Sequence, residues 1–152
     1  MQVWRITSRK YRQFDGEGAR LFSARWHVPG TAIVYTSMSL SLAALEVFVH
    51  FDTDVSPTGL VAIPAEIPEK VKVEHIDISR LPKNWRAHPP PQALKPIGSL
   101  WAARGSSVAL SVPSALIPSE RNYLLNPKHR DFQLIQIGKP LPFRFDSRMW
   151  KN

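Results

Sequence analysis

Residues 36–50, TSMSLSLAALEVFVH, contain the stretch that decides the fold. Between Leu40 and Val49 the only charged side chain is Glu46, so a helix here is apolar on nearly every side. That pattern is typical of a helix buried in a core. An ionised carboxylate in such surroundings must be paired, neutralised or used by the protein. Glu46 is therefore either an active-site acid or a glutamate on one polar stripe of a partly exposed helix, and the pattern alone leaves both open.

Short β-prone runs surround this helix. The runs at residues 60–67 and 70–78 are expected to be neighbouring strands, whereas the glycine-rich residues 14–30 and the proline-rich residues 81–94 predict loops. A glycine turn is expected at 97–103. The other predicted strands are residues 2–7 (QVWRIT), 31–36 (TAIVYT), 107–112 (SVALSV), 132–137 and 143–145. The count predicts an α+β fold, with mixed or antiparallel sheets and one main buried helix.

Length and composition predict one folded domain over residues 1–152. The chain is 43% hydrophobic and 21% charged, and its longest apolar run is far shorter than the roughly 20 residues that cross a bilayer. The amino terminus lacks the apolar segment of a secretory signal, so no membrane association is expected. The absence of cysteine excludes disulfides and thiolate metal sites, and it fits a reducing cytoplasm.

The charge balance predicts an anionic partner. Lys and Arg number 20 against 12 Asp and Glu, which gives a net charge of +8. The cations are scattered without the dense basic block of a nucleic-acid-binding arm, but six of them fall within the first 25 residues, which suits a pocket for phosphates. A non-catalytic basic module that binds nucleic acid and a merely solvated basic surface remain alternatives.

The strong local signatures of phosphate loops, zinc proteases and serine hydrolases are missing, and the five histidines show no metal-ligand spacing. What remains is a set of separated polar residues beside apolar runs. Arginines can clamp a pyrophosphate, a tyrosine ring can stack on a heteroaromatic ring, and a buried glutamate can stabilise positive charge on a sugar carbon. Such groups could break an N-glycosidic bond in a dinucleotide, although Ser114 is by base rate a turn or helix cap. The candidates are Arg5, Arg25, Tyr35, Glu46 and Ser114.

The order and spacing of eight short motifs resemble the RES-domain proteins, which are toxins of a class of bacterial type II toxin–antitoxin pairs. No single motif is specific, and together they span nearly the whole chain. The motifs are WRI at 4–6, GARLFSARW at 18–26, VYT at 34–36, SLAALEVFVH at 41–50, GSLW at 98–101, VPSA at 112–115, NYLLNPKH at 122–129 and FDSR at 145–148. Two positions depart from the family pattern: His27 stands where asparagine is usual, and Ser99 stands where aspartate often follows glycine.

The resemblance implies an ADP-ribosyltransferase-like fold with NAD as the substrate, and the spacing of the histidines predicts no metal site. Its expected activity is cleavage of the nicotinamide–ribose bond by hydrolysis or phosphorolysis, with transfer of ADP-ribose to a protein as the alternative. It also implies a separate Xre-type antitoxin, whose C-terminal part blocks the active site and whose DNA-binding part provides the only link to nucleic acid. By position, the expected roles are phosphate binding for Arg5 and Arg25, nicotinamide contact for Tyr35, ribose and transition-state contact for Glu46, completion of the pocket for Ser114, and a place at the rim for Asn122.

Overall fold

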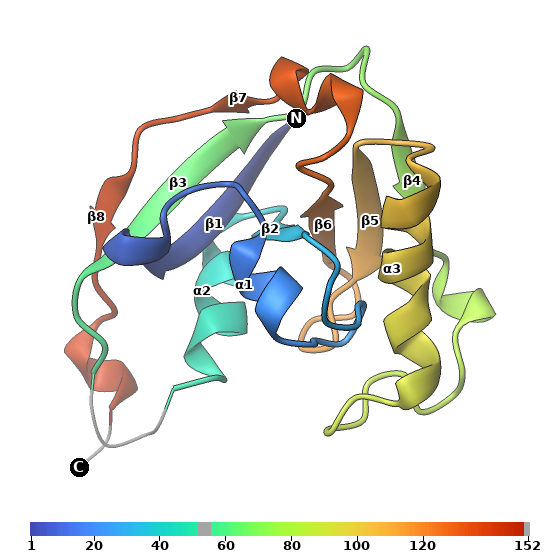
Figure 1. The fold of residues 1–152 in the computed structure, drawn as a ribbon. Coiled ribbons are helices and arrows are strands. Elements are labelled where there is room, and N and C mark those ends of the chain that lie inside the picture. Colours follow the sequence, from blue (N-terminus) through green and yellow to red (C-terminus); the bar gives the residue numbers. More distant parts are fainter. Residues whose placement is uncertain (52–55, 151–152) are drawn as a thin grey trace.

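The computed structural model describes residues 1–51 and 56–150 (Figure 1). Eight strands of the described chain form one sheet: β1 (Gln2–Ser8), β2 (Val34–Ser37), β3 (Leu60–Glu66), β4 (Val73–His75), β5 (Ala109–Pro113), β6 (Arg121–Leu125), β7 (Gln136–Ile137) and β8 (Leu141–Phe143). The α-helices are α1 (Glu17–Leu21), α2 (Leu40–Phe48) and α3 (Lys95–Arg104), and short 3-10 helices cover Arg9–Tyr11, Ile78–Arg80, Gln92–Leu94, Arg130–Leu134 and Ser147–Met149. None of the helices described is long and apolar enough to span a bilayer.

The sheet is mixed, with the strand order β4-β5-β6-β2-β1-β3-β7, and β8 also pairs with β3. All pairings are antiparallel except that of β4 with β5, which is parallel. The predicted α+β fold class with mixed sheets is therefore confirmed.

The expectation that the strands at 60–67 and 70–78 are neighbours is wrong. Strand β3 pairs with β1 along its whole length, and its other edge is taken by β7 and β8. Because both edges of β3 are occupied, β4 pairs instead with β5 at the far end of the sheet. Only three residues of the alternating run at 70–78 form that strand.

Helix α2 forms where it was predicted, but it is buried on one side only. The Ser39 hydroxyl caps its first turn by accepting a hydrogen bond from the Leu42 amide at 3.1 Å. Leu42 and Ala43 are buried on its inner side, while Leu45 and Val49 remain exposed. The inner side packs against β1 and β2, and Glu46 is half-buried rather than enclosed in the core.

Helix α3 was not predicted, because its sequence KPIGSLWAAR contains a proline and a glycine that resemble turn residues. Pro96 falls in the first turn, where its missing N–H is not needed. The Gly98 amide donates to the Trp26 carbonyl at 2.8 Å, and a Cβ at this position would stand 2.3 Å from the same oxygen. Gly98 therefore permits close packing of α3 on residue 26. The five-residue helix α1 within residues 14–30 was also not predicted.

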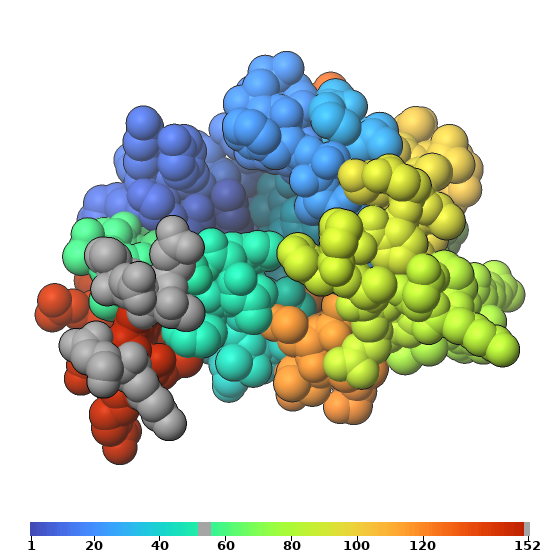
Figure 2. Space-filling model, turned by 90° about the horizontal axis from the view of Figure 1, so that it is seen from below, coloured from blue at the N-terminus to red at the C-terminus, as the bar shows by residue number. Residues whose placement is uncertain are grey.

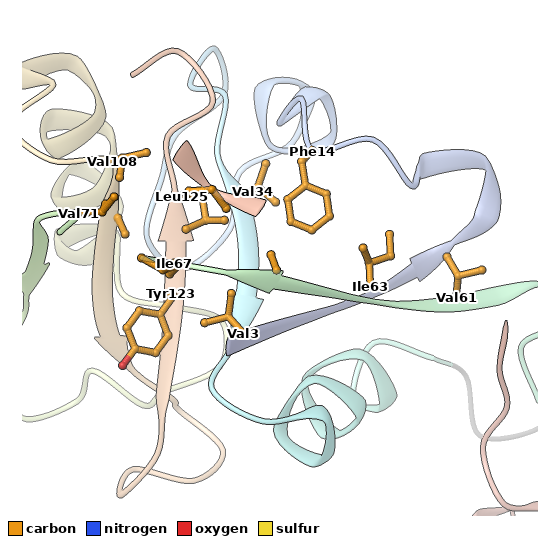
Figure 3. Close-up of a cluster of buried hydrophobic side chains, with 13 residues drawn as sticks. Val3, Phe14, Val34, Val61, Ile63, Ile67, Val71, Val108, Tyr123 and Leu125 are labelled. Carbon is orange, nitrogen blue, oxygen red and sulfur yellow. The ribbon is translucent and has the colours of Figure 1, made fainter. Parts of the chain in front are cut away.

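Buried side chains form three clusters around the sheet. The cluster drawn in Figure 3 gathers side chains from several strands, among them Val3, Ile63 and Leu125. A second cluster contains Trp26, Trp85 and Trp101, so the proline-rich loop is fixed by its own tryptophan. The third lies under α2 and includes Ile6, Ala43, Leu60, Ala62 and Phe145. A hollow in the surface lies between α2 and the second cluster.

Candidate active site

A cleft of about 760 Å³ lies at this opening. Its walls come from β1, β2, α2, the segment at residues 23–26, the proline-rich loop and the turn that follows β5. Figure 2 shows the hollow between the light-blue segment that follows α1, the teal helix α2 and the yellow-green loop. Five of the residues singled out in the sequence line the cleft, namely Arg5, Arg25, Tyr35, Glu46 and Asn122.

Glu46 projects from α2 and is held by two hydrogen bonds on the same oxygen. The Ser114 hydroxyl donates to Oε1 at 2.7 Å, and the Asn122 amide nitrogen donates to Oε1 at 2.6 Å. Oε2 has no partner among the described residues, so it is the carboxylate oxygen available to a ligand. Asn122, which was expected at the rim as a ligand contact, lines the cleft and uses one of its two amide N–H groups to hold Glu46.

Ser114 lies behind Glu46 and is completely buried. Its oxygen accepts hydrogen bonds from the amides of Leu116 and Ile117, each at 3.1 Å. Because these two donors occupy the acceptor sites of the hydroxyl, its proton points at Glu46. Ser114 thus performs the turn-capping role considered from sequence, and it does not line the cleft itself but holds the Glu46 carboxylate that does.

Arg25 brings a partly buried cation to the same cleft as Glu46. Its Nη1 group donates to the carbonyl oxygens of Trp85 and Ala87, the latter at 3.1 Å, and so fastens the proline-rich loop. Burial lowers the pKa of the Arg25 guanidinium, and the charge of Glu46 opposes that shift. A guanidinium stays cationic at neutral pH even so. Its remaining N–H groups, on Nε and Nη2, have no partner among the described residues.

Arg5 occupies the β1 side of the cleft. Its Nη1 group donates to the Gln13 carbonyl, and its guanidinium carbon lies 5.4 Å from the centre of the Phe14 ring. Burial lowers the pKa of this arginine too, with the charge of Asp15 acting in the opposite direction. The cation is thus partly removed from water beside an aromatic ring and a carbonyl.

Tyr35 lines the cleft from β2, with its hydroxyl turned away from solvent. Burial raises the pKa of this hydroxyl well above its usual value, and a backbone hydrogen bond at Trp26 offsets only part of the rise. The hydroxyl lies 2.6 Å from Nδ1 of His27, a residue that is 1% exposed. The position that departs from the family pattern is therefore directly behind a predicted site residue.

Sequence reasoning missed several residues of the cleft. Ser37 donates to the Asn122 carbonyl oxygen at 2.7 Å, and its place two residues after Tyr35 on one strand face could have predicted this. Arg86 and Lys95 also line the cleft, because the proline-rich loop folds over it. No pattern of residues in the sequence predicts that position for them. Arg86 donates to the Ala115 carbonyl at 2.9 Å.

The cleft is strongly cationic. Among its described lining residues, Arg5, Arg25, Arg86 and Lys95 face the single carboxylate of Glu46. None of these four cations forms an ion pair with a carboxylate of the described chain. Arg5, Arg25 and Lys95 are partly buried, and partly desolvated cations without counterions in the described chain favour an anionic ligand with several oxygens. Within residues 1–51 and 56–150, no group of three or more His, Asp or Glu could hold a metal ion.

Comparison with known proteins extends over almost the whole chain. A sequence model of the RES domain family matches residues 2–146. The chain is 40% identical to "Toxin Res" of Photorhabdus laumondii over 99% of its own length and 98% of that protein. It is 36% identical to "Prs ADP-ribosylating toxin" of Sphingobium sp., over 96% of its length and 94% of that toxin.

The fold also matches a solved structure, the crystal structure of the M. tuberculosis MbcT–MbcA toxin–antitoxin complex. The TM-score is 0.74 at 14% identity, and the match covers 94% of this chain and 84% of that one. This likeness confirms the predicted fold, and the family match accounts for the motifs quoted above. The chain belongs to the RES domain family of toxins.

Proposed function

We propose that this chain is the toxin of a toxin–antitoxin pair and that it depletes NAD by cleaving the bond between nicotinamide and ribose. The observation that carries the proposal is the cleft itself, whose lining combines one carboxylate, with an oxygen that has no partner in the described chain, and guanidinium groups that form no ion pair there. Arg5 and Arg25 suit the pyrophosphate of a dinucleotide. The ring of Tyr35, which lines the same cleft, suits a flat heteroaromatic group.

The expected chemistry separates neutral nicotinamide from a positively charged sugar. When the bond from the ribose carbon to the ring nitrogen breaks, its electron pair goes to nicotinamide, and positive charge develops on the ribose carbon. The free oxygen of Glu46 would stabilise that charge, and Ser114 and Asn122 hold the carboxylate in place through its other oxygen. Water then adds to the carbon and loses a proton, or phosphate adds instead, to complete hydrolysis or phosphorolysis.

Transfer of ADP-ribose to a protein is the second candidate. One observation favours it: the relative from Sphingobium sp. is named as a toxin that ADP-ribosylates Prs. Both reactions break the same bond, and they differ only in the nucleophile that reaches the ribose carbon. NAD labelled on its adenosine half separates them, because only protein transfer leaves the label on a macromolecule.

The partner would be a separate antitoxin protein, as in the MbcT–MbcA toxin–antitoxin complex. We propose an Xre-type antitoxin whose C-terminal part fills the cleft, with any contact to nucleic acid made through that antitoxin. The cytoplasm, where NAD is abundant, would be the site of action.

The test is release of nicotinamide by the purified protein incubated with NAD. Glu46→Gln keeps the size of the side chain but removes its charge, and should lower the rate by about 10²–10³, as loss of one transition-state contact does in other enzymes. Glu69→Gln removes a carboxylate from an exposed position that does not line the cleft and should leave the rate unchanged. Equal rates for wild type and Glu46→Gln would refute the proposed role of Glu46. No release by the wild type, together with salt-sensitive binding of nucleic acid, would favour the basic-module alternative.

A further inference from the structure

His27 is the most completely buried titratable side chain beside the cleft that the proposed chemistry does not use. It is 1% exposed and lies in the segment between α1 and β2. Its Nδ1 atom lies 2.6 Å from the Tyr35 hydroxyl, and its Nε2 atom lies 2.8 Å from the carbonyl oxygens of both Ala19 and Phe22. The imidazole thus bridges a cleft residue and the backbone around α1.

The partners of the two ring nitrogens fix the tautomer. Carbonyl oxygens only accept hydrogen bonds, so Nε2 carries a hydrogen and shares it between Ala19 and Phe22. In the neutral ring Nδ1 is then the acceptor, and the Tyr35 hydroxyl donates to it. Every polar atom of the buried imidazole has a partner.

This arrangement restricts what Tyr35 can do in the cleft. Its hydroxyl proton is committed to His27, so the hydroxyl cannot also donate to a ligand. The two rings are tilted by 49° with their centres 5.5 Å apart, so the contact is a directed hydrogen bond and not a stack. What Tyr35 offers a ligand is its ring, at an orientation that the hydrogen bond to His27 holds.

We propose that His27 is a positioning residue, which holds the ring of Tyr35 in the orientation that contacts the substrate. This inference rests on the proposed NAD-cleaving function for its kinetic consequences. Its structural part, the donation from Tyr35 to the Nδ1 atom of an Nε2–H imidazole, stands without any substrate.

Two substitutions remove the hydrogen bonds at the two ring nitrogens one at a time. In His27→Asn the side-chain oxygen lies near the position of Nδ1, so it still accepts from Tyr35 while the donor to Ala19 and Phe22 is lost. In His27→Gln the amide nitrogen lies near the position of Nε2, so it keeps the donor to the two carbonyls and loses the acceptor for Tyr35. A purely structural histidine would tolerate the glutamine better, whereas a positioning histidine would tolerate the asparagine better.

We expect His27→Gln to lower kcat/KM for NAD by about three- to tenfold, the effect of one net hydrogen bond, while its thermal stability stays close to wild type. His27→Asn should show the reverse, with kcat/KM retained and Tm lowered. In a Tyr35→Phe background, His27→Gln should have no further kinetic effect, because the hydroxyl on which it acts is absent. His129→Gln is the matched control: His129 donates to the Gly105 carbonyl at 3.0 Å and does not line the cleft.

Nitrogen NMR of the histidine rings in the unliganded protein tests the structural part separately. The resonances that disappear in His27→Gln should be those of a neutral Nε2–H ring, and an Nδ1–H ring or an imidazolium would overturn the inference. Kinetic loss greater in the asparagine than in the glutamine variant would also overturn it. If the wild type releases no nicotinamide, the proposed function fails, while the NMR result still decides the hydrogen bond.

Discussion

Removal of the Ser114 hydroxyl gives the sharpest test of how the cleft is built. Ser114→Ala changes one buried atom that has three partners: it donates to Glu46 and accepts from the amides of Leu116 and Ile117. The substitution leaves the carboxylate with Asn122 as its remaining donor in the described chain. Both stability and activity should therefore change, by amounts that can be worked out separately.

The loss of stability follows from the three hydrogen bonds. The bond to a carboxylate is worth about 1.5–3 kcal/mol, and the two partly buried amides left without an acceptor add a smaller cost, so the free energy of unfolding falls by about 2–4 kcal/mol. For a chain of this length each kcal/mol corresponds to about 2–4 °C, so Tm should fall by about 4–16 °C.

The loss of activity follows from the carboxylate alone. If Ser114 holds Glu46 in its working position, losing a bond of about 1.5–3 kcal/mol lowers kcat by about 10- to 100-fold. The expected residual rate exceeds that of Glu46→Gln, because the charge is still present. A serine acting as a nucleophile would instead leave no turnover.

Circular dichroism during heating measures Tm, and chromatographic detection of nicotinamide measures turnover at a temperature where every variant is folded. Ser107→Ala is the matched control, since this buried hydroxyl accepts from Trp101 at 2.8 Å and donates to the Ala109 carbonyl outside the cleft. It should lose stability and keep its turnover. A Ser114→Ala rate no lower than that of Ser107→Ala would refute the reasoning.

Three further outcomes are expected. Ser37→Ala leaves the carbonyl oxygen of Asn122 unpaired and should slow nicotinamide release about three- to tenfold, whereas Ser37→Thr should retain the rate, as measured by steady-state kinetics. Gly98→Ala places a Cβ 2.3 Å from a backbone oxygen and should lower Tm by about 2–12 °C, whereas Gly18→Ala, with nothing within 4 Å, should not lower it; circular dichroism during heating measures both. Burial raises the pKa of Tyr35 above its ordinary 10.0, so the stability that its protonated hydroxyl contributes is complete below pH 10 and is lost as the pH rises further. Urea unfolding at pH 8 and pH 10.5 should therefore show a smaller fall in the free energy of unfolding for Tyr35→Phe than for the wild type.

The sequence predicted the candidate site better than it predicted the sheet. Arg25, Tyr35 and Glu46 line one cleft although they come from different segments, and the order of the motifs was enough to group them. The sequence could not predict which groups donate and accept the hydrogen bonds of the site. Asn122 could be placed near the site, but its commitment to Glu46 depends on the pairing of β6 with β2, which sets Asn122 opposite Ser37.

The errors in the predicted fold arise from contacts between segments that are distant in sequence. Strand β4 is three residues long, and the free edge of β5 decides its partner. Helix α3 was predicted as a turn because glycine, here Gly98, weakens a helix. The reason for a glycine at this position is its close approach to the Trp26 carbonyl, which only the structure shows. Helix α2 was predicted at its place, but which of its sides is exposed depends on the strands beneath it.

The separation of Glu46 from its two donors along the chain has a consequence for synthesis. The carboxylate is made first, and Ser114 and Asn122 follow 68 and 76 residues later. At about 5–20 residues per second, a ribosome needs roughly 4–15 s to add the second of them. If Glu46 acts as proposed, a growing polypeptide lacks the completed site until most of it has been translated, and the proposed antitoxin could bind each new molecule as it is finished.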